Sequence, residues 1–197
     1  MPKTPLERRL PTISLGEALH KRESHPDQAA QTTLSLDAVS LLVTPLSEKV
    51  GAQNRHYPSG GALYPVETYL IGSFESGSKK NTVYHYHPKA HALEKLWDTP
   101  ETFEFDQLFR SLVDGTRLQA AMIFTAVWER SAKKYGDFAY NLALLEAGHM
   151  AQNVLLAATE LGVQMCPMGG FDDATASELL DLKNDAEQAV YCLSIQK

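Results

Sequence analysis

One long helical pattern limits the folds that are open to this chain. Residues 137–161 read DFAYNLALLEAGHMAQNVLLAATEL, and Gly162 follows as a natural C-terminal cap. Six residues of this segment recur at helical spacing and would share one side of the helix: Phe138, Leu142, Leu145, His149, Asn153 and Leu156. Other apolar residues surround this row, so the helix is predicted to lie centrally in the molecule rather than on its surface.

The segments around this helix predict one mixed α+β domain. The unbroken apolar run LQAAMIFTAVW predicts a strand buried on both faces. Further strands are predicted at VETYLIG, at AVYCLSI and in two short pieces of TVYHYHPKAHALEKLW, whereas VQMCPMGGFDD is either a loop or a short strand. Helices are predicted at SLGEALHKR, SLDAVSLLVTPL and DATASELLDL from their capping residues, and at FDQLFRSLVDG, closed by Gly115. The domain is expected to cover residues 1–197, with about 1–13 as an N-terminal arm.

Charge and cysteine content exclude several classes of function. The net charge is -6 and the pI about 5.6, so nucleic acid and anionic membranes would repel the chain. No stretch approaches the roughly 18 apolar residues of a membrane span, and the first residues carry no signal peptide, which favours a cytoplasmic protein. Cys166 and Cys192 have no metal-ligand spacing and are expected to be reduced thiols.

Two glycine-rich loops are candidates for a binding site. PSGGALYP holds Gly60 and Gly61, and PMGGFDD holds Gly169 and Gly170. Glycine lacks Cβ, so backbone N–H groups in these loops could approach a planar ring closely; from glycine content alone, two ordinary tight turns are the stronger interpretation. Neither loop matches the dinucleotide fingerprint or a Walker loop.

Several polar residues allow both a functional and a structural interpretation. Arg22 and Ser24 could grip a phosphate, or could form the solvated basic end of a helix. The lysine and tyrosine of KKYG follow the buried strand and could form a proton-transfer pair, or could be exposed loop residues. Glu146 and His149 have one copy of a di-iron spacing, but a buried, hydrogen-bonded polar pair is favoured. Zinc is conceivable, but a hairpin with aromatic packing is favoured and no metal is expected, at the three histidines His85, His87 and His91.

Four segments, taken in order, resemble the SagB-type dehydrogenases, the azoline-oxidising branch of the FMN-dependent nitroreductase superfamily. The segments are RHYPSGGALYPVETYLI, VYHYHPKAHALEKL, ERSAKKYGDFAYNLALLEAGHMAQNVLLAA and CPMGGFDD. The resemblance runs from about Leu15 to Ile195. It implies an α+β sandwich of the nitroreductase type, with a central antiparallel or mixed sheet flanked by helices. It also implies an interlocked homodimer that holds FMN at its interface.

The resemblance further implies roles for particular residues. Lys134 and Tyr135 match the Lys-Tyr pair to which azoline oxidation is attributed in the family. The residues that match FMN-binding positions, or are expected to assist them, are Arg22, Ser24, Arg55, Pro58, Ser59, Gly60, Gly61, Gly169 and Gly170. Pro26 stands where the family has a second phosphate-binding arginine, and either His25 or Arg55 could compensate.

The implied activity is the oxidation of a thiazoline or oxazoline ring to a thiazole or oxazole, with a hydride passing to flavin N5 and O2 as the final acceptor. The ring would be presented by a carrier protein of a peptide synthetase or by a cyclodehydratase complex acting on a ribosomal peptide. Two alternatives stay open on the same fold. One is a general NAD(P)H-dependent nitro- or quinone reductase, and the other is a flavin-free scaffold subunit.

Overall fold

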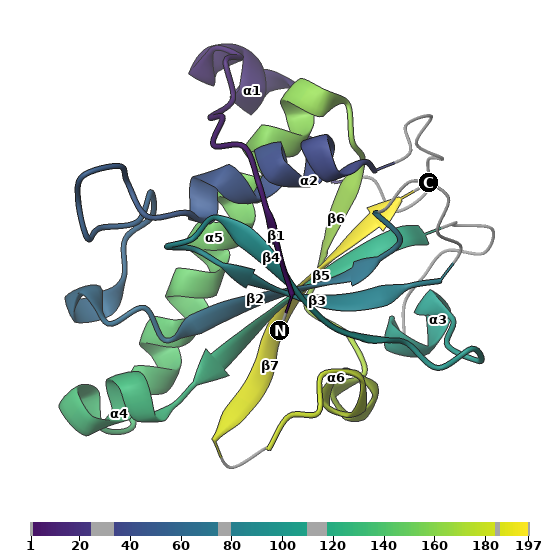
Figure 1. Ribbon diagram of the computed structural model, residues 1–197. Helices are drawn as coiled ribbons and strands as arrows, with labels where there is room; N and C mark the ends of the chain where they lie inside the picture. Colours follow the sequence, from purple (N-terminus) through teal and green to yellow (C-terminus); the bar gives the residue numbers. More distant parts are fainter. Residues whose placement is uncertain (1, 25–33, 75–79, 110–117, 184–185, 197) are drawn as a thin grey trace.

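A seven-stranded sheet forms the centre of the molecule in a computed structural model, which describes residues 2–24, 34–74, 80–109, 118–183 and 186–196 (Figure 1). The strands lie in the order β1-β4-β3-β2-β5-β7-β6, and every neighbouring pair is antiparallel. The strands are β1 (Lys3–Pro5), β2 (Val66–Gly72), β3 (Thr82–His87), β4 (Ala92–Asp98), β5 (Leu118–Val127), β6 (Met165–Met168) and β7 (Glu187–Gln196). The helices are α1 (Leu15–Lys21), α2 (Leu36–Val43), α3 (Phe105–Leu108), α4 (Glu129–Tyr135), α5 (Phe138–Leu161) and α6 (Asp173–Leu179).

Helices cover both faces of the sheet. Figure 1 shows α2 and α5 on one side and α3 and α6 on the other. Alternate residues of a strand point to opposite faces, so Leu70 joins the core under α5 whereas Ile71 joins the core under α3 and α6. The predicted α+β class, with helices flanking a central antiparallel sheet, is confirmed.

α5 is the central helix that its sequence pattern predicts. Its inner side is buried along most of its length. Gly162, at φ 63°, ends the helix because its backbone N–H bonds to the carbonyls of Ala158 and Thr159. The outer side still exposes large apolar side chains, including Leu145 with 58% of its surface exposed. Across the described ranges, no helix is both long and apolar enough to span a bilayer.

The capping signals begin three helices where they were predicted. The side chains of Ser14, Ser35 and Asp172 each accept the backbone N–H three residues further on, and so begin α1, α2 and α6. The strand predictions are confirmed too, and VQMCPMGGFDD contains the short strand β6.

Three segments differ from the prediction. β1 lies in the predicted N-terminal arm, and its three residues are too few for an alternating pattern to reveal it. α3 covers only Phe105–Leu108, and Gly115 lies outside the described residues, as does Pro26. The segment expected to be a loop before α5 is helix α4. Its N-cap residue, Trp128, makes no side-chain capping bond, so the sequence carries no start signal there.

Candidate functional site

Residues 55–65 form a tightly bent loop that leads into β2. Gly60–Ala62 make a short 3-10 turn, in which Gly61 has φ 62° and ψ 17°. The next positive φ angles belong to Ala62 at 55° and Tyr64 at 49°, where an L side chain is strained. The hydroxyl of Ser59 accepts the backbone N–H of Tyr64 at 2.9 Å and so ties the two sides of the bend together. The loop is therefore a strained, hydrogen-bonded feature rather than a plain turn.

The predicted Lys-Tyr pair lies directly against this loop. A Cβ atom added at Gly61 would lie 2.6 Å from the Tyr135 hydroxyl and 2.8 Å from Lys134 Nζ. The Lys134 Nζ is 5.2 Å from the centre of the Tyr135 ring. At the neighbouring Gly60, an added Cβ would lie 3.0 Å from the side chain of Leu142 on α5. The loop, α4 and the start of α5 thus meet at one point, and glycine is what permits the close approach.

Arg55 stabilises the same loop from within. Its guanidinium donates to the Tyr57 hydroxyl at 2.7 Å, and its Cζ atom lies 4.5 Å from the centre of the Tyr64 ring. The backbone N–H of Arg55 also donates to the Tyr64 hydroxyl at 3.1 Å. These contacts give Arg55 a structural role in the loop. Its predicted part in holding a phosphate stays a prediction.

A buried carboxyl group, Glu146, lies beneath the loop. Its side chain projects from α5, is 2% exposed, and accepts the backbone N–H of Val66 at 3.4 Å through Oε1. Burial raises the pKa of Glu146 to about 7, although the Ser59 hydroxyl, the Val66 N–H and the charge of Arg55 favour its charged form. Among the described residues its Oε2 atom has no hydrogen-bond partner, so the charged form is poorly stabilised there. His149 is exposed, so the expected buried pair of Glu146 and His149 is wrong.

Replacing Glu146 with Gln should flatten the pH dependence of stability. The folded-state pKa of about 7 exceeds the ordinary value of 4.5, so the folded protein retains a proton that the unfolded chain releases between these values. That stabilisation is complete below pH 4.5, and about 3 kcal/mol of it is lost as pH rises through the folded pKa. Urea unfolding at pH 5 and pH 8 measures it. The wild type should lose about 3 kcal/mol more than Glu146→Gln, and parallel losses would contradict the burial effect.

Arg130 on α4 is a residue of this region that the sequence patterns did not single out. Its guanidinium Nη1 donates to the backbone carbonyl of Tyr64 at 3.1 Å and forms an ion pair with Glu67 on β2. Glu67 in turn contacts His85, which also contacts Glu94. A single arginine, in a helix that has no capping residue at its start, forms no sequence pattern from which its role could be predicted.

The histidines considered as zinc ligands have other partners. His85 lies between the carboxylates of Glu67 and Glu94, with each nitrogen 2.9 Å from an oxygen. His91 is buried, and its Nδ1 lies 2.7 Å from the hydroxyl of Tyr86. Within the part of the chain that the structure describes, no three His, Cys, Asp or Glu residues are grouped to hold a metal ion.

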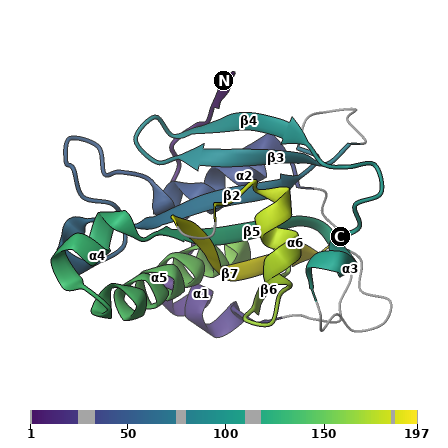
Figure 2. The ribbon, with the colours of Figure 1, turned by 90° about the horizontal axis from the view of Figure 1, so that it is seen from below.

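The predicted phosphate pair lies at the other end of α5. The Arg22 Nη1 is 3.4 Å from the Ser24 hydroxyl, directly after α1. α1 lies near the C-terminal end of α5 and α4 near its N-terminal end, as Figures 1 and 2 show. Leu142, beside the glycine loop, and Leu155, in the cleft beside α1, are separated by roughly 20 Å along the helix axis. One chain therefore does not bring the phosphate pair to the Lys-Tyr pair.

The second glycine loop follows β6. Gly169 and Gly170 are exposed, and an added Cβ at Gly169 would lie more than 4 Å from the other described atoms around it. The backbone here is open to a ligand. The sequence prediction of a binding loop stays a prediction, because no described contact connects it to Gly61.

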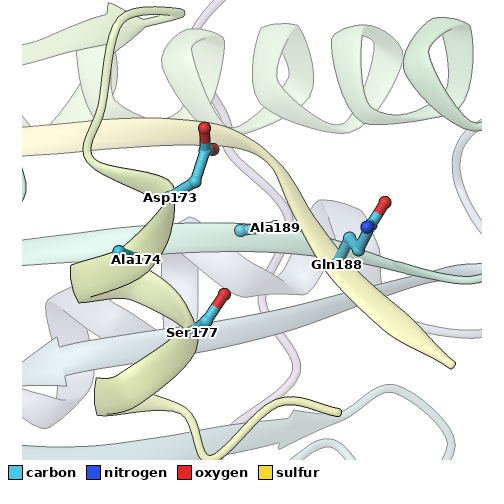
Figure 3. Close-up of a pocket in the computed structure, with 5 residues that line it drawn as sticks. All are labelled: Asp173, Ala174, Ser177, Gln188 and Ala189. Atoms are coloured by element: carbon cyan, nitrogen blue, oxygen red, sulfur yellow. The ribbon is translucent and has the colours of Figure 1, made fainter. Parts of the chain in front are cut away.

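A separate pocket lies between α6 and β7. Figure 3 shows Asp173, Ala174 and Ser177 on α6 facing the start of β7, which supplies Gln188 and Ala189. Its volume is about 450 Å³. Among the described residues of this lining, Asp173 is the one that titrates, whereas Gly61 lies beside both Lys134 and Tyr135. The region around Gly61 remains the stronger candidate site.

Several known proteins are similar to this chain in sequence. The profile of the nitroreductase family matches residues 27–195. The microcin B17-processing protein McbC of Escherichia coli is 34% identical over 140 residues, which are 67% of this chain and 50% of McbC. The trifolitoxin-processing protein TfxB of Rhizobium leguminosarum bv. trifolii is 25% identical over 186 residues, which are 88% of this chain and 50% of TfxB. The chain thus spans about half the length of these two relatives.

Solved structures agree with the sequence matches. A chain of the E. coli microcin synthetase McbBCD complex, determined with truncated pro-MccB17 bound, superposes with a TM-score of 0.68 and 27% identity. The match covers 94% of this chain and 73% of that chain. The resemblance that the four sequence segments predict is confirmed by these matches.

Proposed function

The chain belongs to the nitroreductase family, and from that premise we propose that it oxidises a thiazoline or oxazoline ring of a peptide to the aromatic thiazole or oxazole with FMN. The observation that carries this proposal is the contact of Gly61 with both Lys134 and Tyr135. The loop that could lie against a planar cofactor therefore contacts a possible base, Lys134, and the hydroxyl of Tyr135. A simple reductase has no need of such a base.

The residues present fit a flavin. At Gly61, two close side chains leave no room for a Cβ, and at Gly169 the space where a Cβ would lie is open. Because neither position carries a side chain, both loops can offer backbone N–H groups to a ligand. Arg22 and Ser24 would hold the phosphate with a charged fork and a hydroxyl. Pro58, Ser59, Gly60 and Gly61 would follow the ring edge, and Gly169 and Gly170 would lie near N5, as the family resemblance implies.

The chain's own contribution is proton transfer and positioning. When bound, FMN would supply a two-electron acceptor for the hydride that leaves the ring, with O2 as the final oxidant. Lys134 would take the proton that leaves the neighbouring atom of the azoline, or would stabilise the anion that forms. Tyr135, whose hydroxyl lies beside Lys134 at the same glycine, would hold the amine in place. Ring oxidation removes two hydrogens, and aromaticity of the product favours it.

A homodimer would complete the site. The outer face of α5 exposes Phe138 and Leu145, and α1 exposes Leu15 and Leu19, each with more than half of its surface in contact with solvent. Large apolar side chains that are exposed on two contacting helices favour burial against a partner. If α5 packs against its copy across a two-fold axis in antiparallel fashion, the phosphate pair of one chain comes beside the Lys-Tyr pair of the other. The two pairs would then meet across the interface, although within one chain they are separated by roughly 20 Å along α5.

The azoline would be presented by a protein partner. The solved complex that this chain resembles is a microcin synthetase with a truncated propeptide bound, and the relative TfxB processes trifolitoxin. These names favour a cyclodehydratase complex that acts on a ribosomal peptide over a carrier protein of a peptide synthetase. Both present a ring on a macromolecule.

The proposal is tested first by the cofactor. The purified protein should show the visible absorption of a flavin, release FMN on heat denaturation, and have twice the mass of one chain by light scattering. Leu145→Asp places a charge on the apolar face of α5 and should give a monomer that no longer retains FMN. Val50→Asp, at a residue 89% exposed in another part of the chain, is the matched control and should keep both properties.

Two results would contradict parts of this proposal. Wild-type protein that stays colourless after FMN is added would favour a flavin-free scaffold. Rapid bleaching of the bound flavin by NADPH alone, with no azole formed from any azoline peptide, would favour a nitro- or quinone reductase.

A further inference from the structure

We infer that Arg130 is a positioning residue, which holds α4 against the glycine loop so that the Lys134 amine stays at Gly61. The inference rests on the proposed role of Lys134. Its geometric part concerns the position of that amine and is measurable without any substrate.

The guanidinium of Arg130 joins three parts of the molecule. Its side chain leaves α4 one helical turn before Lys134, so both residues lie on the same side of that helix. Its Nη1 donates to the carbonyl of Tyr64, the last residue but one before β2, and pairs with Glu67 on β2. A single side chain thus links the helix that carries Lys134, the end of the glycine loop, and the sheet.

Glu67 is a fixed anchor for this contact. It is 9% exposed, and its second carboxylate oxygen lies 2.9 Å from His85 Nε2 on β3. The other ring nitrogen of His85 lies 2.9 Å from Glu94 on β4, whose remaining oxygen is 2.7 Å from Lys3 on β1. Charges of alternating sign therefore cross four neighbouring strands and end at Arg130.

This arrangement requires a charged histidine. Burial alone would lower the pKa of His85, but its hydrogen bonds to Glu67 and Glu94 outweigh burial and raise it. Both ring nitrogens then carry hydrogen and donate to carboxylates. The Arg130 and His85 contacts lower the pKa of Glu67 despite its burial, so Glu67 meets Arg130 as a carboxylate. A buried, charged and doubly bonded partner holds a guanidinium more firmly than an exposed pair does.

α4 needs such a tether because it buries little of its own surface. It has seven residues, no side-chain cap at its start, and one buried residue, Ser131. A helix this short has marginal stability without tertiary contacts. Since Lys134 itself is exposed, its position depends on how α4 is held.

Arg130→Gln tests this inference by competitive acetylation of lysines, read by mass spectrometry on the full-length protein. Release of α4 should raise the labelling of Lys134 relative to Lys133, its exposed neighbour on the same helix, by about threefold or more. Turnover should fall by on the order of tenfold, with flavin retained. Arg9→Gln, which removes an ion pair to Glu160 at 3.7 Å elsewhere, is the control and should change neither.

Two further variants keep the test decisive if Arg130→Gln folds poorly. Glu67→Gln removes the anchor charge and should raise the same labelling ratio. Arg130→Lys keeps the charge but not the planar fork, so it should restore the ratio only in part. An unchanged ratio in Arg130→Gln or Glu67→Gln, with circular dichroism like that of the wild type, overturns the inference. A raised ratio in a protein whose wild type oxidises no azoline supports the positioning role and counts against the proposed function instead.

Discussion

Lys134→Ala is expected to stop azole formation while the protein keeps its fold and its FMN. The side chain is exposed, so its truncation removes little packing and should leave the unfolding temperature almost unchanged. Loss of a positioned base costs on the order of 10² to 10⁴ in rate. The measurement is the mass of an azoline peptide after incubation, which falls by two hydrogens on oxidation, together with the absorption spectrum of the variant.

Two neighbouring variants make this result specific. Lys133→Ala removes an equal charge from the adjacent position of α4 and should turn over like the wild type. Tyr135→Phe removes only the hydroxyl at Gly61 and should have an intermediate effect. Full turnover by Lys134→Ala would show that Lys134 is not the base, even if FMN is bound as expected.

Local patterns predicted the elements whose signals lie within their own residues. Ser14, Ser35 and Asp172 begin helices because their side chains meet N–H groups three residues away. α5 follows from its length and helical periodicity, and β5 follows from its unbroken apolar run. These signals are local, so one sequence is enough to find them.

The features that were missed depend on contacts across the fold. α4 has no side-chain capping bond at its start, and it forms where β5 ends and α5 packs beside it. β1 is a strand because β4 has a free edge for it. The role of Arg130 depends on its contacts with Glu67 and Tyr64, which are more than sixty residues away in the sequence. No spacing rule connects such positions.

The candidate site, like the fold, could be predicted from the sequence only in part. Motif resemblance named Gly61, Lys134 and Tyr135, and the structure brings the three together. It leaves Arg22 and Ser24 at the opposite end of α5, although the resemblance assigns all five residues to one active site. The proposed homodimer would reconcile these positions by composing the site from two chains, and neither the sequence spacing nor one folded chain contains that information.

Gly61→Ala should reduce activity far more than it reduces stability, and Gly162→Ala provides the comparison. The two glycines have almost the same backbone, with φ 62° and ψ 17° at Gly61 and φ 63° and ψ 21° at Gly162. An alanine in this conformation costs about 1 kcal/mol at either position. Urea unfolding should therefore give similar losses for the two variants.

The difference between them lies in what the new Cβ touches. At Gly162 it meets nothing within 4 Å, whereas at Gly61 it would lie 2.6 Å from the Tyr135 hydroxyl and 2.8 Å from Lys134 Nζ. These are the ends of flexible side chains, so they would move aside with little loss of folding energy. A displacement of this kind can cost on the order of 10² in rate when the moved group takes part in the reaction. Equal activity in the two variants would mean that the contact of Gly61 with the Lys-Tyr pair plays no part in catalysis.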